Sequence, residues 1–425
     1  MKQRIKFEYK WIIAVLSAVM VMTTLGFCSS SKDIYLKAIT SALGIKRALF
    51  SFNDVCRYLS TSVLNLFFGV LIVKFGPKKL ILAGFASLMI SCLIYSFADS
   101  IYVFYIGGVF LGIGLAWCTT NIVGYVIGKW FTENKGTVMG VVLASNGIGS
   151  TIAMQVFVPI IDSGTFGYRT AYRIIALTLL AVAVLIAIFF REKPKGYVEK
   201  LDGAPAKKKP SRGQSWDGIS FETAKRKPYF WIAMLGIFFT GFCLQSVLGI
   251  KTAHLEDVGL KSFKATVGSF YSMSIVATKI LSGVSYDKFG LRKTLAINYI
   301  SGIVSVAMLA FLGLTAASSV QVYAVAANMI LAMAIPLETV MIPLITNDLF
   351  GEKAYAKLLG IFLGVSVAGY AAGTPVINLI YDATGTYKWA LIGVSCILAV
   401  ILASFFVAIK LAQKDKERVL AGECM

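Results

Sequence analysis

Two stretches of this chain repeat one another. Residues 69–82 read GVLIVKFGPKKLIL, and residues 283–296 read GVSYDKFGLRKTLA. At a spacing of 214 residues (283 minus 69), Gly, Val, Lys, Phe, Gly and Lys recur at matching places. Each stretch follows a long apolar run. The repeat therefore predicts two like-oriented halves built on one plan.

The apolar runs identify the surroundings of these halves. The chain is 57% hydrophobic and only 15% charged, whereas a soluble chain carries about 25% charged residues. Each run is long enough to cross a bilayer as a helix, and backbone in lipid must satisfy its own hydrogen bonds. We predict an all-α membrane protein with twelve spans, at residues 11–31, 48–72, 79–98, 101–126, 137–160, 171–190, 230–250, 265–285, 294–314, 320–345, 358–380 and 389–409.

The basic residues predict the orientation. Of 41 Lys and Arg residues, 29 lie in or at the edges of the loops on the side of the two termini, 10 lie in or at the edges of the opposite loops, and Arg57 and Lys279 lie deeper within spans. Because basic loops stay on the cytoplasmic side, both termini should be cytoplasmic. The charge is split among short loops, which argues against a nucleic-acid partner. With no targeting segment recognised, the expected location is the cytoplasmic membrane of a bacterium.

A polar segment divides the chain between its sixth and seventh runs. Residues 191–229 are rich in Lys, Pro and Gly and read as a flexible cytoplasmic linker. We expect an amino-terminal six-helix bundle over residues 1–190. A carboxyl-terminal six-helix bundle with a short cytoplasmic tail should occupy residues 230–425.

The second run carries a polar stripe. Asp54, Arg57, Thr61 and Asn65 follow the spacing i, i+3, i+7 and i+11, which places them on one helical face. Ionisable groups within a span are costly and usually face the protein interior or water. We expect the stripe to face a central cavity or the neighbouring half. Asp54 and Arg57 can neutralise one another across one turn, either as a permanent pair or as one that opens for a substrate or a proton.

Two further charges lie within predicted spans. Lys279 has no charged neighbour within one turn of its own helix. Glu338 lies between Pro336 and Pro343 in the tenth run, where proline predicts a kinked helix. An acid in apolar surroundings can take up a proton, so Glu338 either carries a coupled proton, with Asp54 as the other candidate, or is satisfied by a neighbouring helix.

The repeated stretches also resemble a known loop, the G-x-x-x-D-[RK]-x-G-[RK]-[RK]-[RK] signature of the major facilitator superfamily. The matching residues are Gly283, Asp287, Lys288, Gly290 and Arg292 in the second copy, and Gly69, Lys74, Gly76 and Lys78 in the first. Val73 replaces the acid of the first copy. The resemblance covers essentially the whole chain and implies two six-helix repeats. It also implies that the loops latch the halves in one conformation, with the first latch weakened at Val73.

Two stretches narrow the resemblance to one branch. Residues 129–149, KWFTENKGTVMGVVLASNGIG, and 279–290, KILSGVSYDKFG, resemble the monocarboxylate transporters and the oxalate–formate antiporter group. In that branch an arginine eight residues before the loop acid pairs with a substrate carboxylate, and Lys279 occupies this place. Ile275 stands where the monocarboxylate carriers have an acid, and Ser366 where the oxalate carriers have a second cation. One core cation favours a substrate with one carboxylate.

The resemblance implies a secondary active transporter that moves a small organic anion by alternating access, with proton coupling or by exchange. The proposed substrate-binding residues are Lys279, Arg57, Asp54, Thr61 and Asn65. A drug or metabolite exporter of the same superfamily, working as a proton antiporter, is the alternative. The sequence contains no recognisable catalytic, metal-binding or ATP-binding pattern, so we expect neither an enzyme nor a cofactor. One chain in the lipid bilayer should form one functional carrier.

Overall fold

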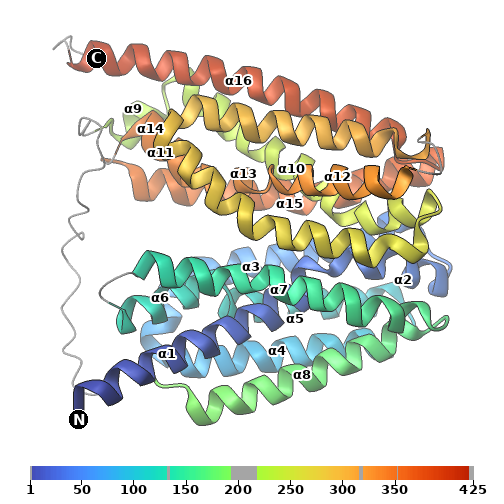
Figure 1. Cartoon of the computed structure of the whole chain (residues 1–425). Coiled ribbons are helices and arrows are strands. Elements are labelled where there is room, and N and C mark those ends of the chain that lie inside the picture. Colours follow the sequence, from blue (N-terminus) through green and yellow to red (C-terminus); the bar gives the residue numbers. More distant parts are fainter. Residues whose placement is uncertain (1, 132–134, 193–217, 315–318, 352, 421–425) are drawn as a thin grey trace.

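The computed structural model describes residues 2–131, 135–192, 218–314, 319–351 and 353–420. Within these ranges the chain is helical and contains no strand. Figure 1 shows two bundles of long helices that lie against each other, with α1 beginning and α16 finishing at the same end of the molecule. We call this the termini end and the opposite one the far end.

The amino-terminal bundle wraps around one hydrophobic core. Its elements are α1 (Lys2–Val21), the π-helix η1 (Met22–Ser30), the 3-10 turn η2 (Lys32–Tyr35), α2 (Leu36–Leu43), α3 (Arg47–Phe75), α4 (Pro77–Phe97), α5 (Ile101–Cys118), α6 (Thr120–Trp130), α7 (Lys135–Asp162) and α8 (Gly167–Phe189). Gly44 ends α2 in a left-handed conformation, and Pro77 begins α4, each at a position that favours these residue types.

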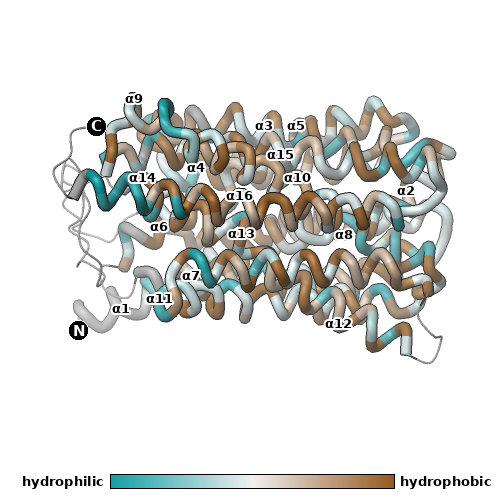
Figure 2. Tube along the Cα trace, turned by 90° about the horizontal axis from the view of Figure 1, so that it is seen from above, coloured by the Kyte–Doolittle hydropathy of each residue, from teal (hydrophilic) through white to brown (hydrophobic). Residues whose placement is uncertain are grey.

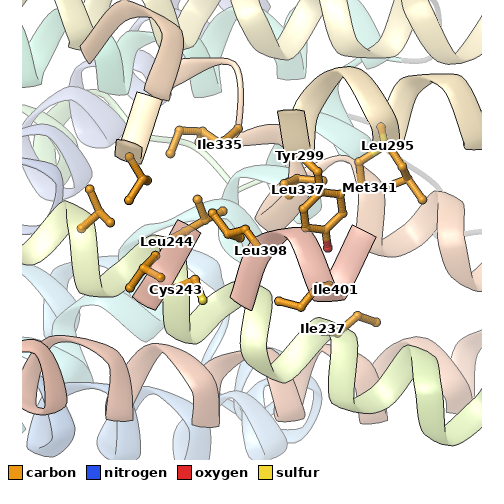
Figure 3. Packing of buried hydrophobic residues seen from close by; sticks show 14 of the residues in the cluster. Ile237, Cys243, Leu244, Leu295, Tyr299, Ile335, Leu337, Met341, Leu398 and Ile401 are labelled. Atoms are coloured by element: carbon orange, nitrogen blue, oxygen red, sulfur yellow. The ribbon is translucent and has the colours of Figure 1, made fainter. Parts of the chain in front are cut away.

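The carboxyl-terminal bundle has a second core, part of which is shown in Figure 3. Its elements are α9 (Phe221–Ala224), α10 (Pro228–Asp257), η3 (Lys261–Phe263), α11 (Lys264–Ala310), η4 (Leu312–Leu314), α12 (Val320–Ala332), α13 (Pro336–Thr339), α14 (Met341–Phe350), α15 (Tyr355–Thr384) and α16 (Lys388–Leu420). Figure 2 shows that hydrophobic residues predominate along the middle of the helices, while hydrophilic residues occur mainly toward both ends of the molecule.

The structure confirms the predicted fold of twelve membrane-spanning helices. Ten helical segments in the described ranges are long and apolar enough to cross a membrane. One of them, Lys261–Ala310, contains two predicted spans, because the chain turns at Gly290 within α11. The remaining predicted span, the second, is the helix α3, with 29 residues. It differs from the ten apolar segments in its charged and polar side chains. The protein is therefore an all-α membrane bundle of two six-helix repeats.

Three predicted spans are not continuous α-helices. The first changes from α1 to the π-helix η1 at Met22. The fourth breaks between α5 and α6 at Thr119, whose backbone is extended (φ −123°, ψ −147°). The tenth divides into α12, α13 and α14, with Pro336 at the first turn of α13, in agreement with the predicted kink. Such breaks free backbone groups inside a membrane protein, where they commonly accompany functional sites.

The repeat seen in the sequence is also a repeat of backbone geometry. Gly76, between α3 and α4, has φ 78° and ψ 159°, and Gly290 in α11 has φ 75° and ψ 175°. This combination is essentially restricted to glycine. The same turn therefore joins the second and third spans of both halves.

The predicted linker, residues 191–229, lies mostly outside the described residues, which omit 193–217. Its final part is described and contacts the carboxyl-terminal bundle. The Ile219 N–H donates to the Phe350 carbonyl oxygen at 3.0 Å, and Lys227 pairs with Asp415 of α16 at 2.8 Å. The helix α10 thus begins from a segment that is already fixed to its own half.

Candidate functional site

Three charged side chains meet inside the amino-terminal bundle. The Lys32 ammonium lies 2.5 Å from one Asp54 oxygen, and the Arg57 guanidinium lies 3.4 Å from the other. Arg57 also donates to Ser29 Oγ at 3.2 Å. The side chain of Arg57 is only 2% exposed and that of Asp54 is 12% exposed. The predicted pair of Asp54 and Arg57 is present, but Asp54 is shared with a second and closer cation.

The shape of the first span explains why Lys32 was missed. The sequence places Lys32 just after a predicted span that ends at residue 31. In the structure, the π-helix η1 and the turn η2 prolong the span, and they bring Lys32 beside Asp54 of α3. The only sequence signal was a lysine directly after an apolar run, which is ordinarily read as a loop residue.

A line of contacts joins this cluster to the other half. The Arg57 guanidinium lies 4.2 Å from the ring centre of Tyr58. The Tyr58 hydroxyl donates to Gln245 Oε1 at 3.1 Å, and the Gln245 amide donates to both carboxylate oxygens of Glu338, at 3.3 and 3.1 Å. Tyr370 donates to the Glu338 backbone oxygen at 3.3 Å. Glu338, on the broken tenth span, is therefore connected to Arg57 through two neutral side chains.

Lys279 has a different environment from the cations of the amino-terminal half. It lies half-buried on α11, and no carboxylate of the described residues lies within 4 Å of its ammonium group. The structure thus leaves Lys279 without a fixed ion pair in the described part of the chain.

The lower part of the polar stripe points to neighbouring helices of the same half. The Thr61 hydroxyl donates to the backbone oxygens of Arg57 at 2.9 Å and of Gly112 at 3.0 Å. The exposed Asn65 accepts a hydrogen bond from Asn121 of α6 at 3.2 Å. These hydrogen bonds stay within the amino-terminal half and do not test whether the stripe faces a central cavity or the other half. A substrate role for Thr61 and Asn65 stays a prediction.

A cavity of about 50 Å³ lies against the charged cluster. Lys32, Asp54 and Arg57 supply its charged lining, and Gly249 and Thr374 reach it from the other half. Its aromatic lining consists of Phe27, Tyr35, Phe50, Tyr95 and Tyr172. The cavity has room for a few water molecules or a very small solute. Two cations and one carboxylate give its wall an excess of one positive charge.

The two copies of the repeated loop have different partners. At the first copy, the Lys78 N–H donates to Glu192 at 3.2 Å, and a carboxylate is favourable at the N-terminus of a helix such as α4. At the second copy, Asp287 and Lys288 are exposed, and the Arg292 guanidinium lies 5.0 Å from the ring centre of Phe406. Glu192 therefore supplies a carboxylate near the loop that lacks one at Val73. Sequence reasoning missed it because Glu192 lies more than a hundred residues away.

Several ion pairs between the two halves lie toward the far end. Arg47 makes two bonds to Asp257, at 2.5 and 2.9 Å. Asp382 accepts from the N–H groups of Arg47 and Ala48 at 3.2 and 2.9 Å. Lys264 pairs with Asp162 at 2.8 Å. These contacts hold the halves together at the far end, beyond the cluster around Asp54.

Known proteins are similar to this chain in sequence and in architecture. The chain is 24% identical over 371 residues to the oxalate:formate antiporter of Oxalobacter formigenes, covering 83% of this chain and 80% of that protein. It is 23% identical over 336 residues to monocarboxylate transporter 12 of Rattus norvegicus, covering 73% and 67%. A bacterial homologue of the human lysosomal transporter Spinster, solved in an inward-facing and unoccupied conformation, superimposes with a TM-score of 0.70 at 16% identity, covering 96% and 98%. The sequence model of the Major Facilitator Superfamily matches residues 11–347, and the chain belongs to that family.

Proposed function

We propose that this transporter moves a small organic anion with one carboxylate across the cytoplasmic membrane of a bacterium. One observation carries the proposal: the wall of the cavity holds Lys32 and Arg57 against the single acid Asp54. A buried charge without a counter-charge is unfavourable. An anion of charge −1 at this wall supplies the missing counter-charge.

The charges of the other half leave this balance unchanged. Lys279 and Glu338 add one positive and one negative charge. The five groups together therefore carry one net positive charge. A monocarboxylate brings this sum to zero, whereas a dianion would leave one negative charge. This agrees with the sequence, in which Ser366 stands where the oxalate carriers have a second cation.

Glu338 is the better candidate for a coupled proton. A proton that arrives at Asp54 must compete with two cations, at 2.5 and 3.4 Å. Glu338 is held by the neutral amide of Gln245, so that protonation there breaks no close ion pair. In this proposal Asp54 holds the cation pair in place, and Glu338 exchanges the proton or, in a pure exchanger, only balances Lys279.

Transport by the purified protein in proteoliposomes tests the proposal. Radiolabelled formate, lactate and oxalate are offered separately, with and without a pH gradient, and with and without the same unlabelled anion inside. We expect formate or lactate to enter faster than oxalate. Dependence on the gradient indicates symport, and dependence on internal anion indicates exchange.

Two results would overturn the proposal. Faster entry of oxalate than of either monocarboxylate would contradict the charge balance. No entry of any of the three, together with gradient-driven extrusion of a cationic dye, would favour the exporter. Empty liposomes and liposomes containing the Lys279→Gln variant serve as controls for leakage.

A further inference from the structure

Two neighbouring residues of one short turn take part in two different networks. Lys32 contacts Asp54 within its own half. Asp33, the next residue, contacts the other half: its Oδ2 lies 3.0 Å from the Lys251 ammonium, and it accepts a hydrogen bond from the Thr252 hydroxyl. The turn η2 thus joins the proposed substrate cluster directly to α10.

The pair of Asp33 and Lys251 is the most deeply buried ion pair between the halves in the described ranges. Its two side chains are 1% and 3% exposed, whereas those of Lys37 and Asp257 are 31% and 20% exposed. Along α10, Lys251 lies about 9 Å from Gln245 and about 9 Å from Asp257, at about 1.5 Å per residue. The pair therefore lies between the central contacts and the ion pairs of the far end.

The backbone around η2 is suited to a change of register. The first span passes from α-helix to the π-helix η1, then to the 3-10 turn η2, and returns to α-helix in α2. Helical segments of these kinds are less stable than α-helix and often mark sites that rearrange. Asp33 Oδ1 is also buried without a hydrogen-bond partner among the described residues. A small rotation of η2 would therefore change the partners of both Lys32 and Asp33.

We propose that the turn η2 couples occupation of the substrate cluster to opening of the far end, through the ion pair of Asp33 and Lys251. The inference rests on the proposed function. A substrate carboxylate competes with Asp54 for Lys32. When Lys32 moves toward the substrate, the turn η2 moves with it. Asp33 then separates from Lys251 and Thr252, and α10 is released from the first span. Without an anion, Lys32 stays on Asp54 and the far end stays closed.

Chemical labelling of a buried position measures this opening. Ser51 of α3 is buried and accepts a hydrogen bond from Asn378 of the other half at 2.7 Å. A Ser51→Cys variant in proteoliposomes is treated with a membrane-impermeant maleimide from the side of the far end. The chain without this substitution gives the background from the native cysteines. We expect slow labelling that lactate or formate accelerates.

Breaking the pair should remove the control by the anion. In Asp33→Asn with Lys251→Met, both charges are absent, which avoids leaving one buried charge unpaired. We expect basal labelling to rise about fivefold or more, the lower bound of common coupling between sites, and to respond little to the anion. Lys37→Gln is the matched control, since it removes a more exposed pair. Lys37→Gln should change basal labelling less than the double variant does, and the anion should still accelerate labelling.

Two further variants separate the steps. Lys32→Gln keeps the pair of Asp33 and Lys251 intact, so labelling should stay slow with and without the anion. Thr252→Val keeps both charges and removes one hydrogen bond to Asp33, so basal labelling should rise by a smaller factor even if the double variant folds poorly. Unchanged basal labelling in Thr252→Val and in any folded double variant would overturn the inference.

The measurement of basal labelling needs no substrate, so its result does not depend on the proposed function. If no carboxylate accelerates labelling of the parent but the double variant still labels faster, the ion pair closes the far end and the proposed substrate is wrong. If the anion accelerates the parent and the double variant equally, from equal basal rates, the substrate stands and the coupling through Asp33 is wrong.

Discussion

The two halves share one fold but hold their central charges in different ways. In the amino-terminal half, Asp54 is fixed between Lys32 and Arg57, at 2.5 and 3.4 Å. In the carboxyl-terminal half, Lys279 and Glu338 have no ion pair within 4 Å among the described residues, and the Glu338 carboxylate accepts hydrogen bonds from the neutral amide of Gln245. The first half thus presents a prearranged surface, and the second holds the groups that are freer to respond to a substrate or a proton.

The same contrast extends to the repeated loops. Glu192 lies on the N-terminus of α4 in the first half, whereas Asp287 of the second half is exposed. The two halves share the glycine turn, whereas the acids near it lie at different places in the chain. The two halves therefore should not respond equally to equivalent substitutions, and four substitutions test this difference.

The largest effect is expected at Lys279. A hydrogen bond to a charged group contributes about 1.5–3 kcal/mol, so Lys279→Gln should lower uptake per folded molecule about 100-fold. Membrane abundance should stay normal, because Lys279 holds no close ion pair. Lys279→Arg should keep part of the activity. Uptake of labelled lactate or formate, divided by the amount of protein, is the measurement. Lys293→Gln, an exposed position at the termini end, is the control, and normal uptake by Lys279→Gln would remove this lysine from the site.

The second effect concerns stability in the amino-terminal half. Asp54→Asn leaves Lys32 and Arg57 together without a counter-charge, and breaking a buried pair in this way costs about 3–5 kcal/mol. We expect low abundance and a lower unfolding temperature for Asp54→Asn. The double variant Asp54→Asn with Arg57→Gln leaves one cation and should recover abundance. Thermal unfolding in detergent and membrane abundance measure the difference.

Uptake by this double variant then separates the two interpretations of the pair. If the pair is only structural, the folded double variant should transport almost normally. If substrate disturbs the pair, uptake per folded molecule should remain low. Arg57→Ala should destabilise less than Asp54→Asn, since Lys32 still neutralises Asp54. Equal destabilisation by the two single variants would contradict the shared arrangement seen in the structure.

A smaller and more selective effect is expected at Glu338. Glu338→Gln cannot exchange a proton but can keep hydrogen bonds to Gln245. If transport is proton-coupled, the variant should lose accumulation driven by a pH gradient and keep exchange of labelled for unlabelled substrate. Asp54 is the other candidate for the coupled proton. The double variant Asp54→Asn with Arg57→Gln, in which abundance should recover, is therefore tested in the same way. Gradient-driven accumulation in both variants would exclude both acids as the coupling group.

The sequence predicted the architecture better than the site. Apolar runs and the repeat at Gly76 and Gly290 depend on local residue patterns, so that spans and turns could be predicted. The contacts of Asp54 depend on the π-helix η1, which periodicity did not reveal, and hence Lys32 was assigned to a loop. Gln245 was not singled out, although it is a polar residue within an apolar run. Its role depends on the packing of α10 against Tyr58 and Glu338, which a single sequence does not specify.

The smallest effect is expected at the loop of the first half. Glu192→Gln removes a carboxylate from the N-terminus of α4, where such a group contributes about 0.3–1 kcal/mol. In a protein of this size, this should lower the unfolding temperature by about 2 °C or less.

Asp287→Asn is the matched control in the second half. Because Asp287 is exposed, this substitution should leave the unfolding temperature unchanged. Its effect should instead be on transport, if the termini end closes on this acid during the cycle. Differential scanning fluorimetry and uptake on the same preparations compare the two. If Asp287→Asn lowers the unfolding temperature as much as Glu192→Gln, the two acids serve their loops alike, and the halves differ only in their central charges.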